Sequence, residues 1–89
     1  MKKMNKAKKV QGLNKYIGLM FKTKTTAPLI FEFDKDVLIP IHSYFVFFKF
    51  KAIWYDKDGN RIEERIVKPF TSSVKPSKPF RKLVEIPLE

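Results

Sequence analysis

The chain is 89 residues long and carries 19 Lys and Arg against 9 Asp and Glu, which gives a net charge of +10. A chain of this length folds around a single core, and a hydrophobic content of 44% excludes a wholly disordered protein. The lack of Cys and the single His exclude disulfides, thiolate nucleophiles and the Cys and His clusters that bind metals. We therefore predict no enzymatic activity, no catalytic residue, no metal and no cofactor.

The positive charge is concentrated at the N-terminus. Residues 1–31 contain eight Lys and no acid, whereas residues 32–65 contain six basic and seven acidic residues. Residues 1–9 hold five Lys and little apolar surface, which predicts a flexible tail ahead of one mainly β domain at 10–89. The tail lacks the apolar run of a secretory signal, and no apolar stretch approaches the roughly 20 residues of a membrane span. We expect a cytoplasmic protein.

In chain order, the first predicted element is a short helix over residues 11–22, where Leu13, Tyr16, Ile17 and Met20 form one helical stripe. The hydrophobic period then changes to two, which predicts a strand over 29–34 and a polar turn at 35–36. Alternating aromatic residues from 44 to 55 predict two more strands with a bend near 48–49, because single strands are rarely so long.

The Asp-Lys-Asp-Gly-Asn sequence of residues 56–60 predicts a turn in which Gly59 is able to adopt positive φ. We expect a strand over 61–67 that runs back beside the preceding one, with Ile62 and Ile66 facing inward. Residues 68–79 hold three Pro and three Ser and predict an irregular segment. The last predicted strand covers 83–88, where Pro87 indicates an edge or the strand's end. The predicted fold class is α+β, mostly β: a compact antiparallel sheet or small barrel of five to six short strands with one short N-terminal helix.

Several segments together carry a family resemblance. They are Gly18–Phe21, Leu29–Phe33, His42–Asp56, Asp58–Gly59, Lys68–Phe70 and Leu83–Pro87. In order and spacing they resemble the uncharacterised domain-of-unknown-function family 192, in its short archaeal-type form, over roughly residues 10–87. The resemblance implies a compact, mainly β domain with a short N-terminal helix and no established activity. The chain departs from the family at 49–51, where Lys-Phe-Lys replaces the usual Pro-hydrophobic-Asp.

His42 is the residue at which we expect a ligand-binding site. It begins the strongest family-like segment, and an imidazole is able to act as a general base or a ligand contact. We group Met20, Ser43 and Lys68 with His42 as the other candidate ligand-binding residues. The structural alternative, which we favour for His42, is a ring hydrogen-bonded to the backbone near a strand start.

The aromatic run also allows a nucleic-acid hypothesis, because bases stack on aromatic rings while Lys contacts phosphate. We favour the alternative that these rings belong to the core and that the interleaved Lys residues lie at a solvated bend. The predicted function is a non-enzymatic small β binding module for an unidentified small molecule or protein partner, monomeric and without membrane contact. The alternative function is sequence-nonspecific binding of nucleic acid or another anionic polymer through Lys2, Lys3, Lys6, Lys8, Lys9, Lys49 and Lys51.

Overall fold

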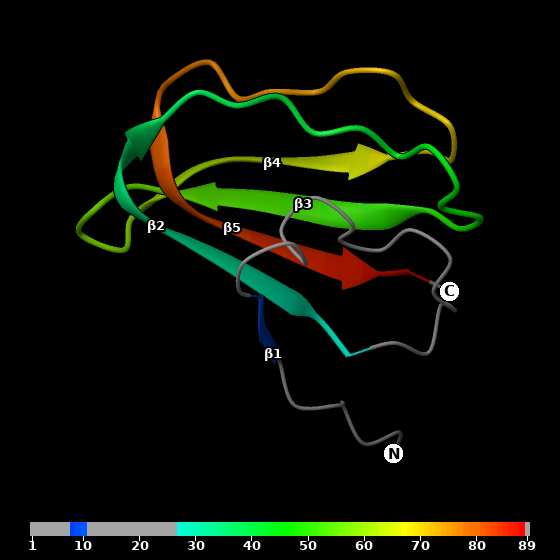
Figure 1. The fold of residues 1–89 in the computed structure, drawn as a ribbon, viewed down its shortest axis with the longest axis horizontal. Coiled ribbons are helices and arrows are strands. Elements are labelled where there is room, and N and C mark those ends of the chain that lie inside the picture. The colour runs from blue at the N-terminus through cyan, green and yellow to red at the C-terminus, as the bar shows by residue number, and fades with distance from the viewer. Residues whose placement is uncertain (1–7, 11–26, 89) are drawn as a thin grey trace.

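One five-stranded sheet forms the framework of the protein (Figure 1). The structure is a computed structural model, and it describes residues 8–10 and 27–88. The strands have the order β1-β2-β5-β3-β4 across the sheet. Strands β2, β5, β3 and β4 pair antiparallel, and β1 adds to β2 in parallel. Their bounds are β1 (Lys8–Val10), β2 (Leu29–Val37), β3 (Phe50–Tyr55), β4 (Arg61–Val67) and β5 (Phe80–Pro87).

Two central strands carry the most deeply buried side chains. Strand β3 places Phe50, Ala52 and Trp54 on one face, and none of them is more than 1% exposed. Strand β5 lies between β2 and β3 and pairs with both. Pro87 is the last residue of β5, where its missing N–H removes no further ladder hydrogen bond. It therefore marks a strand end.

Two long loops cover the face of the sheet that carries Trp54 and complete the core. The first loop, residues 38–49, and the second loop, residues 68–79, run beside each other along the β4 edge of the sheet (Figure 1). An isolated antiparallel bridge joins Ile41 to Val74 through two hydrogen bonds of 2.7 and 2.8 Å. Both residues pack against the core, as does the fully buried Val46 of the first loop. The loops therefore take the place of a second layer.

The predicted α+β class is wrong, because the described residues are all β and contain no helix. They form one open sheet, in which four strands pair antiparallel and β1 is added in parallel at the edge, in place of the predicted small barrel with a helix. The helix predicted over 11–22 lies outside the described residues. Residues 1–7 of the predicted tail also lie outside them, and Lys8 and Lys9 are part of β1. The division into a tail and a domain stays a prediction.

Three predictions made from the sequence pattern are wrong. Residues 44–49 are not a strand, because Phe45 has a φ of 59° and the backbone turns there. Residues 35–36 are not a turn but belong to β2. Ile66 does not face inward, since it is 60% exposed, whereas the neighbouring Val67 is buried. A register shift opposite Trp54 and Tyr55 interrupts the alternation along β4, so one period does not describe the whole strand.

Other predicted elements are confirmed. The strand over 61–67 has the predicted bounds, residues 68–79 contain no named strand, and the bend near 48–49 precedes the start of β3. The turn after β3 closes where Gly59 adopts a φ of 82°. Asp56 Oδ1 accepts hydrogen bonds of 2.9 Å from the N–H groups of Asp58 and Asn60. Both hydrogen bonds lower the pKa of the Asp56 carboxyl, and the one from Asn60 has the larger effect.

In the described part of the chain, no helix has the length and apolarity needed to cross a membrane.

Strand β5 places an acidic side chain in the core. Glu85 lies between its cross-strand neighbours Leu29 and Ala52 and is only 5% exposed. Burial disfavours a carboxylate and raises the pKa of Glu85 to about 8. The indole Nε1 of Trp54 is also buried, and no hydrogen-bond partner contacts it. Glu85 is therefore mostly protonated at neutral pH, within an apolar layer.

We expect Glu85 to make the folded protein less stable as the pH rises. The unfolded chain releases this proton near pH 4.5, whereas the folded protein keeps it up to about pH 8. The native state thus binds more protons in this window, so the free energy of unfolding falls there by up to about 1.4 kcal/mol per pH unit. Urea unfolding measured from pH 5 to pH 8 should show this decline in the wild type and not in Glu85→Gln. The exposed Glu64→Gln is the control and should keep the decline. A Glu85→Gln variant that loses stability as the wild type does would contradict the assignment.

Candidate functional site

Ser43 joins the two loops through both its side chain and its backbone. Its Oγ donates a hydrogen bond to the carbonyl of Lys68 at 2.5 Å and accepts one from the N–H of Thr71 at 2.6 Å. Its N–H donates to the Thr71 carbonyl at 2.8 Å, and its carbonyl accepts from the Phe70 N–H at 2.9 Å. Ser43 is completely buried, so water does not compete for these groups. A single residue of the first loop therefore fixes the position of residues 68–71.

Two turns adjoin these hydrogen bonds, and each turn holds a phenylalanine in a left-handed conformation. Phe45 has a φ of 59° and Phe70 a φ of 58°. The Val46 N–H donates to the Ser43 carbonyl at 3.1 Å and closes the turn around Phe45. A left-handed conformation costs an ordinary residue roughly 1–2 kcal/mol, so the surrounding contacts have to compensate for it.

These turns bring three phenylalanine rings together on the surface. Phe45 is 47% exposed, Phe47 is 62% exposed and Phe70 is 52% exposed. The Phe70 ring centroid lies 6.3 Å from that of Phe45 and 5.4 Å from that of Phe47, both edge-to-face. We call this cluster of Phe45, Phe47 and Phe70 the aromatic surface. Apolar side chains gain nothing from such exposure, so a cluster of them points to an interaction site.

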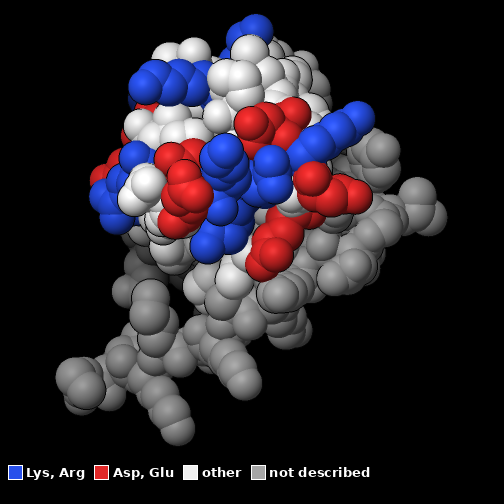
Figure 2. Space-filling model, turned by 90° about the vertical axis from the view of Figure 1, so that its left-hand side faces the viewer, with Lys and Arg blue, Asp and Glu red and all other residues white. Residues whose placement is uncertain are grey.

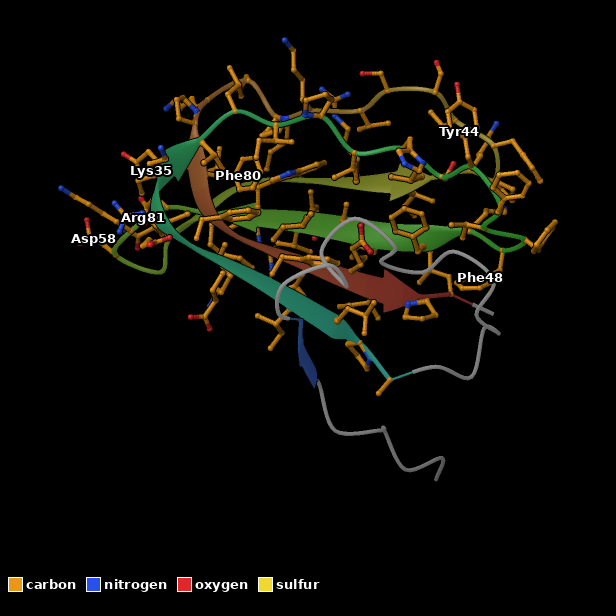
Figure 3. The ribbon with its side chains drawn as sticks, in the orientation of Figure 1. Lys35, Tyr44, Phe48, Asp58, Phe80 and Arg81 are labelled. Atoms are coloured by element: carbon orange, nitrogen blue, oxygen red, sulfur yellow. The ribbon has the colours of Figure 1, made fainter. Side chains whose placement is uncertain are left out.

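A second ring pair lies next to the aromatic surface in the sequence. The His42 and Tyr44 ring centroids are 5.0 Å apart, and the Tyr44 N–H donates to His42 Nδ1 at 3.2 Å. Figure 3 places Tyr44 and Phe48 at the end of the molecule opposite Lys35, Asp58 and Arg81. We call the first of these the loop end and the second the turn end. The loop end therefore carries Tyr44 and Phe48, the two aromatic residues labelled there.

The structure brings together three of the four residues that the sequence grouped as a ligand site. Ser43 contacts Lys68 directly, and His42 precedes Ser43 in the chain, whereas Met20 lies outside the described residues. The roles of these groups differ from one another. Ser43 is buried and joins the loops, Lys68 supplies a backbone carbonyl and an exposed side chain, and His42 is exposed beside Tyr44. Their part in ligand binding stays a prediction.

The predicted aromatic and basic strand face is not formed. Phe45 and Phe47 are loop residues with exposed rings, so the expectation that they belong to the core is wrong. Lys49 is an exposed loop residue, whereas Lys51 is half-buried within β3. Of the predicted nucleic-acid contacts, Lys8 and Lys9 lie in β1, and Lys2, Lys3 and Lys6 lie outside the described residues. Sequence reasoning missed Phe70, because nothing in its irregular surroundings indicates that it packs against Phe47.

The turn end holds a small hollow of about 190 Å³ with mixed charge. Arg81 Nε lies 3.2 Å from Asp36 Oδ1, and Lys82 Nζ lies 4.7 Å from the centre of the Tyr55 ring. Basic and acidic side chains alternate over this end (Figure 2). Among the residues that the structure describes, no three His, Asp or Glu are grouped to hold a metal ion. The hollow is lined by Glu32, Phe33, Asp56, Lys57, Gly59, Arg81 and Lys82.

Comparison with known proteins identifies the fold and no family. No family model and no curated protein match the chain. It is similar to a crystal structure of a protein of unknown function from Novosphingobium aromaticivorans DSM 12444, with a TM-score of 0.78, 15% identity and coverage of 91% of this chain and 61% of that one. It is also similar to a protein from Sinorhizobium meliloti 1021 described as a "putative transcription regulator", with a TM-score of 0.81, 13% identity and coverage of 91% and 67%. Such identities show a shared fold alone, and the resemblance to family 192 stays a prediction.

Glycine should give a more stable protein than alanine at the strained positions 45 and 70, and a less stable protein than alanine at position 47. At positions 45 and 70 the left-handed backbone favours Gly over Ala by about 1 kcal/mol, whereas at position 47 Ala is the more stable residue. We expect Phe70→Gly to have a higher free energy of unfolding than Phe70→Ala, and Phe45→Gly likewise relative to Phe45→Ala. Phe47→Gly should be less stable than Phe47→Ala. Urea unfolding measures all six variants, and the same order at all three positions would show that no strain is present.

Proposed function

We propose that the protein is a small, non-enzymatic β binding module that contacts its ligand through the aromatic surface. The observation that carries this proposal is the pair of strained backbones at Phe45 and Phe70, whose rings are about half exposed. Backbone strain persists where function needs a particular arrangement, and exposed aromatic side chains supply much of the binding energy at protein interfaces. The buried Ser43 holds both turns in place before any ligand arrives, which reduces the ordering cost of binding.

The chemistry of the loop end supports binding without catalysis. Ser43 carries the buried hydroxyl of this end, and its Oγ already donates to the Lys68 carbonyl and accepts from the Thr71 N–H. A nucleophilic Ser needs a base within hydrogen-bond reach and an approach for substrate, and a buried hydroxyl bonded to the backbone lacks both. His42 uses Nδ1 to accept the Tyr44 N–H, so its ring is held beside Tyr44 and this nitrogen is already occupied.

Nucleic acid is the second candidate ligand. The first loop and the second loop contain four Lys and no Asp or Glu, so their charge is complementary to phosphate. The description of the Sinorhizobium relative as a "putative transcription regulator" belongs to that protein, and it gives a reason to test nucleic acid on this one.

Mapping with aromatic probes tests the binding surface without knowledge of the natural ligand. We expect indole and p-cresol at millimolar concentration to shift the backbone amide resonances of residues 44–47 and 70–71 in a heteronuclear NMR titration. Phe47→Ser should abolish these shifts, whereas Ile66→Ser should preserve them. Phe47 and Ile66 are matched in exposure, at 62% and 60%, but Ile66 lies on β4 outside the ring cluster. Probes that bind equally at both residues, or at the turn end instead, would contradict the proposal.

A further inference from the structure

The two ends of the molecule differ in their charge. The described acids lie in β2, in the turn after β3, in β4, and at the buried Glu85. Residues 37–55 and 66–80, which contain both loops, hold no Asp or Glu. Figure 2 shows the turn end, where acidic and basic side chains are intermixed. Among the residues that the structure describes, the loop end therefore presents positive charge without the neutralising carboxylates of the turn end.

Two lysines flank the aromatic surface. Lys49 follows Phe47 by two residues and Lys68 precedes Phe70 by two, and both side chains are exposed. In the described part of the chain no salt bridge holds either ammonium group. Their backbones are nonetheless fixed, because the Lys49 carbonyl accepts from the Leu88 N–H at 3.0 Å and the Lys68 carbonyl accepts from Ser43 Oγ. Both exposed cations thus extend from fixed backbone positions two residues away from Phe47 and Phe70, where an anion is able to reach them.

The rings themselves suit flat ligands. Phe70 meets Phe45 and Phe47 edge-to-face, with interplanar angles of 67° and 71°. This arrangement leaves ring surface exposed on Phe47, the most exposed of the three. In proteins that bind single-stranded nucleic acid, unpaired bases stack on such ring surfaces. In those proteins a positively charged groove beside the rings contacts the sugar-phosphate backbone. A DNA duplex keeps its bases stacked inside, and an acidic peptide supplies charge without flat rings.

We infer that the aromatic surface binds single-stranded nucleic acid, with bases stacked on Phe47 and Phe70 and phosphates on Lys49 and Lys68. This inference rests on the proposed function, because it names the ligand of the same surface. It differs from simple attraction to the lysine-rich N-terminal residues in one respect. Attraction by charge alone does not distinguish a strand with bases from one without them, whereas stacking does.

Fluorescence anisotropy with the full chain tests this inference. The probes are fluorescein-labelled (dT)12 and an abasic deoxyribose-phosphate strand of the same length and charge. We expect (dT)12 to bind at least tenfold more tightly than the abasic strand. Phe47→Leu keeps an apolar side chain and should lose that tenfold preference, whereas Ile66→Leu should retain it. Equal unfolding midpoints for the two variants show that folding is not the cause.

Salt dependence tests the two lysines. Lys49→Gln combined with Lys68→Gln should reduce the slope of log Kd against log salt concentration by about 1.4, since each phosphate contact on a single strand contributes about 0.7. Lys35→Gln combined with Lys57→Gln, two exposed lysines at the turn end, should leave the slope unchanged.

Four results would overturn the inference. Equal affinity for the two strands would mean that charge alone attracts nucleic acid, and an unchanged slope would remove the two lysines. No binding of (dT)12 while indole still maps to residues 44–47 would leave the proposed function standing and direct attention to a protein ligand. Failure of indole and (dT)12 together would remove both proposals.

Discussion

The hydrogen bonds of Ser43 are the interaction on which the loop end depends. Without them, residues 68–71 have no fixed position relative to the first loop, because the other backbone link between the loops is the bridge from Ile41 to Val74. A buried hydroxyl with both a donor and an acceptor partner is specific in direction, unlike the apolar contacts around it. The sheet stabilises the molecule, and Ser43 determines which side chains the loops present.

The sheet stabilises the fold, whereas the loop end carries the surface that we propose for binding. The sheet buries Phe50, Trp54 and Phe80 almost completely, as expected of a small domain that needs most of its apolar surface in the core. The loop end instead exposes three phenylalanine rings and keeps two of them on a left-handed backbone. Both features lower the free energy of unfolding and gain nothing for the fold. They are consistent with a surface shaped for a ligand, at the expense of part of the stability that the sheet supplies.

The sequence predicted those parts of the fold that local chemistry determines. The strand over 61–67 and the turn at Gly59 follow from alternation and from turn residues, and both are confirmed. Residues 44–49 have the same alternation but are a loop, since a long-range contact between Ser43 and residues 68–71 overrides the local pattern. The predicted site grouping includes Ser43 and Lys68, which contact each other, and its role in binding stays a prediction. The contact of Phe70 with Phe47 joins residues distant in sequence and leaves no local signal. Glu85 also reads as an ordinary strand residue, because its burial depends on the neighbours Leu29 and Ala52.

The most direct test of the account is amide hydrogen exchange in Ser43→Ala. This variant keeps the backbone of residue 43 but removes Oγ, which leaves the Thr71 N–H without its acceptor. An amide that loses its partner costs about 1–3 kcal/mol and gains access to water. We predict a large loss of protection at Thr71 and loss of the Phe47–Phe70 ring contact in NMR spectra, with β3 and β5 amides still protected. The exposed Ser72→Ala should change neither. Unchanged protection at Thr71 in Ser43→Ala would contradict the account, because it would show that the Ser43 hydroxyl does not hold residues 68–71 in place.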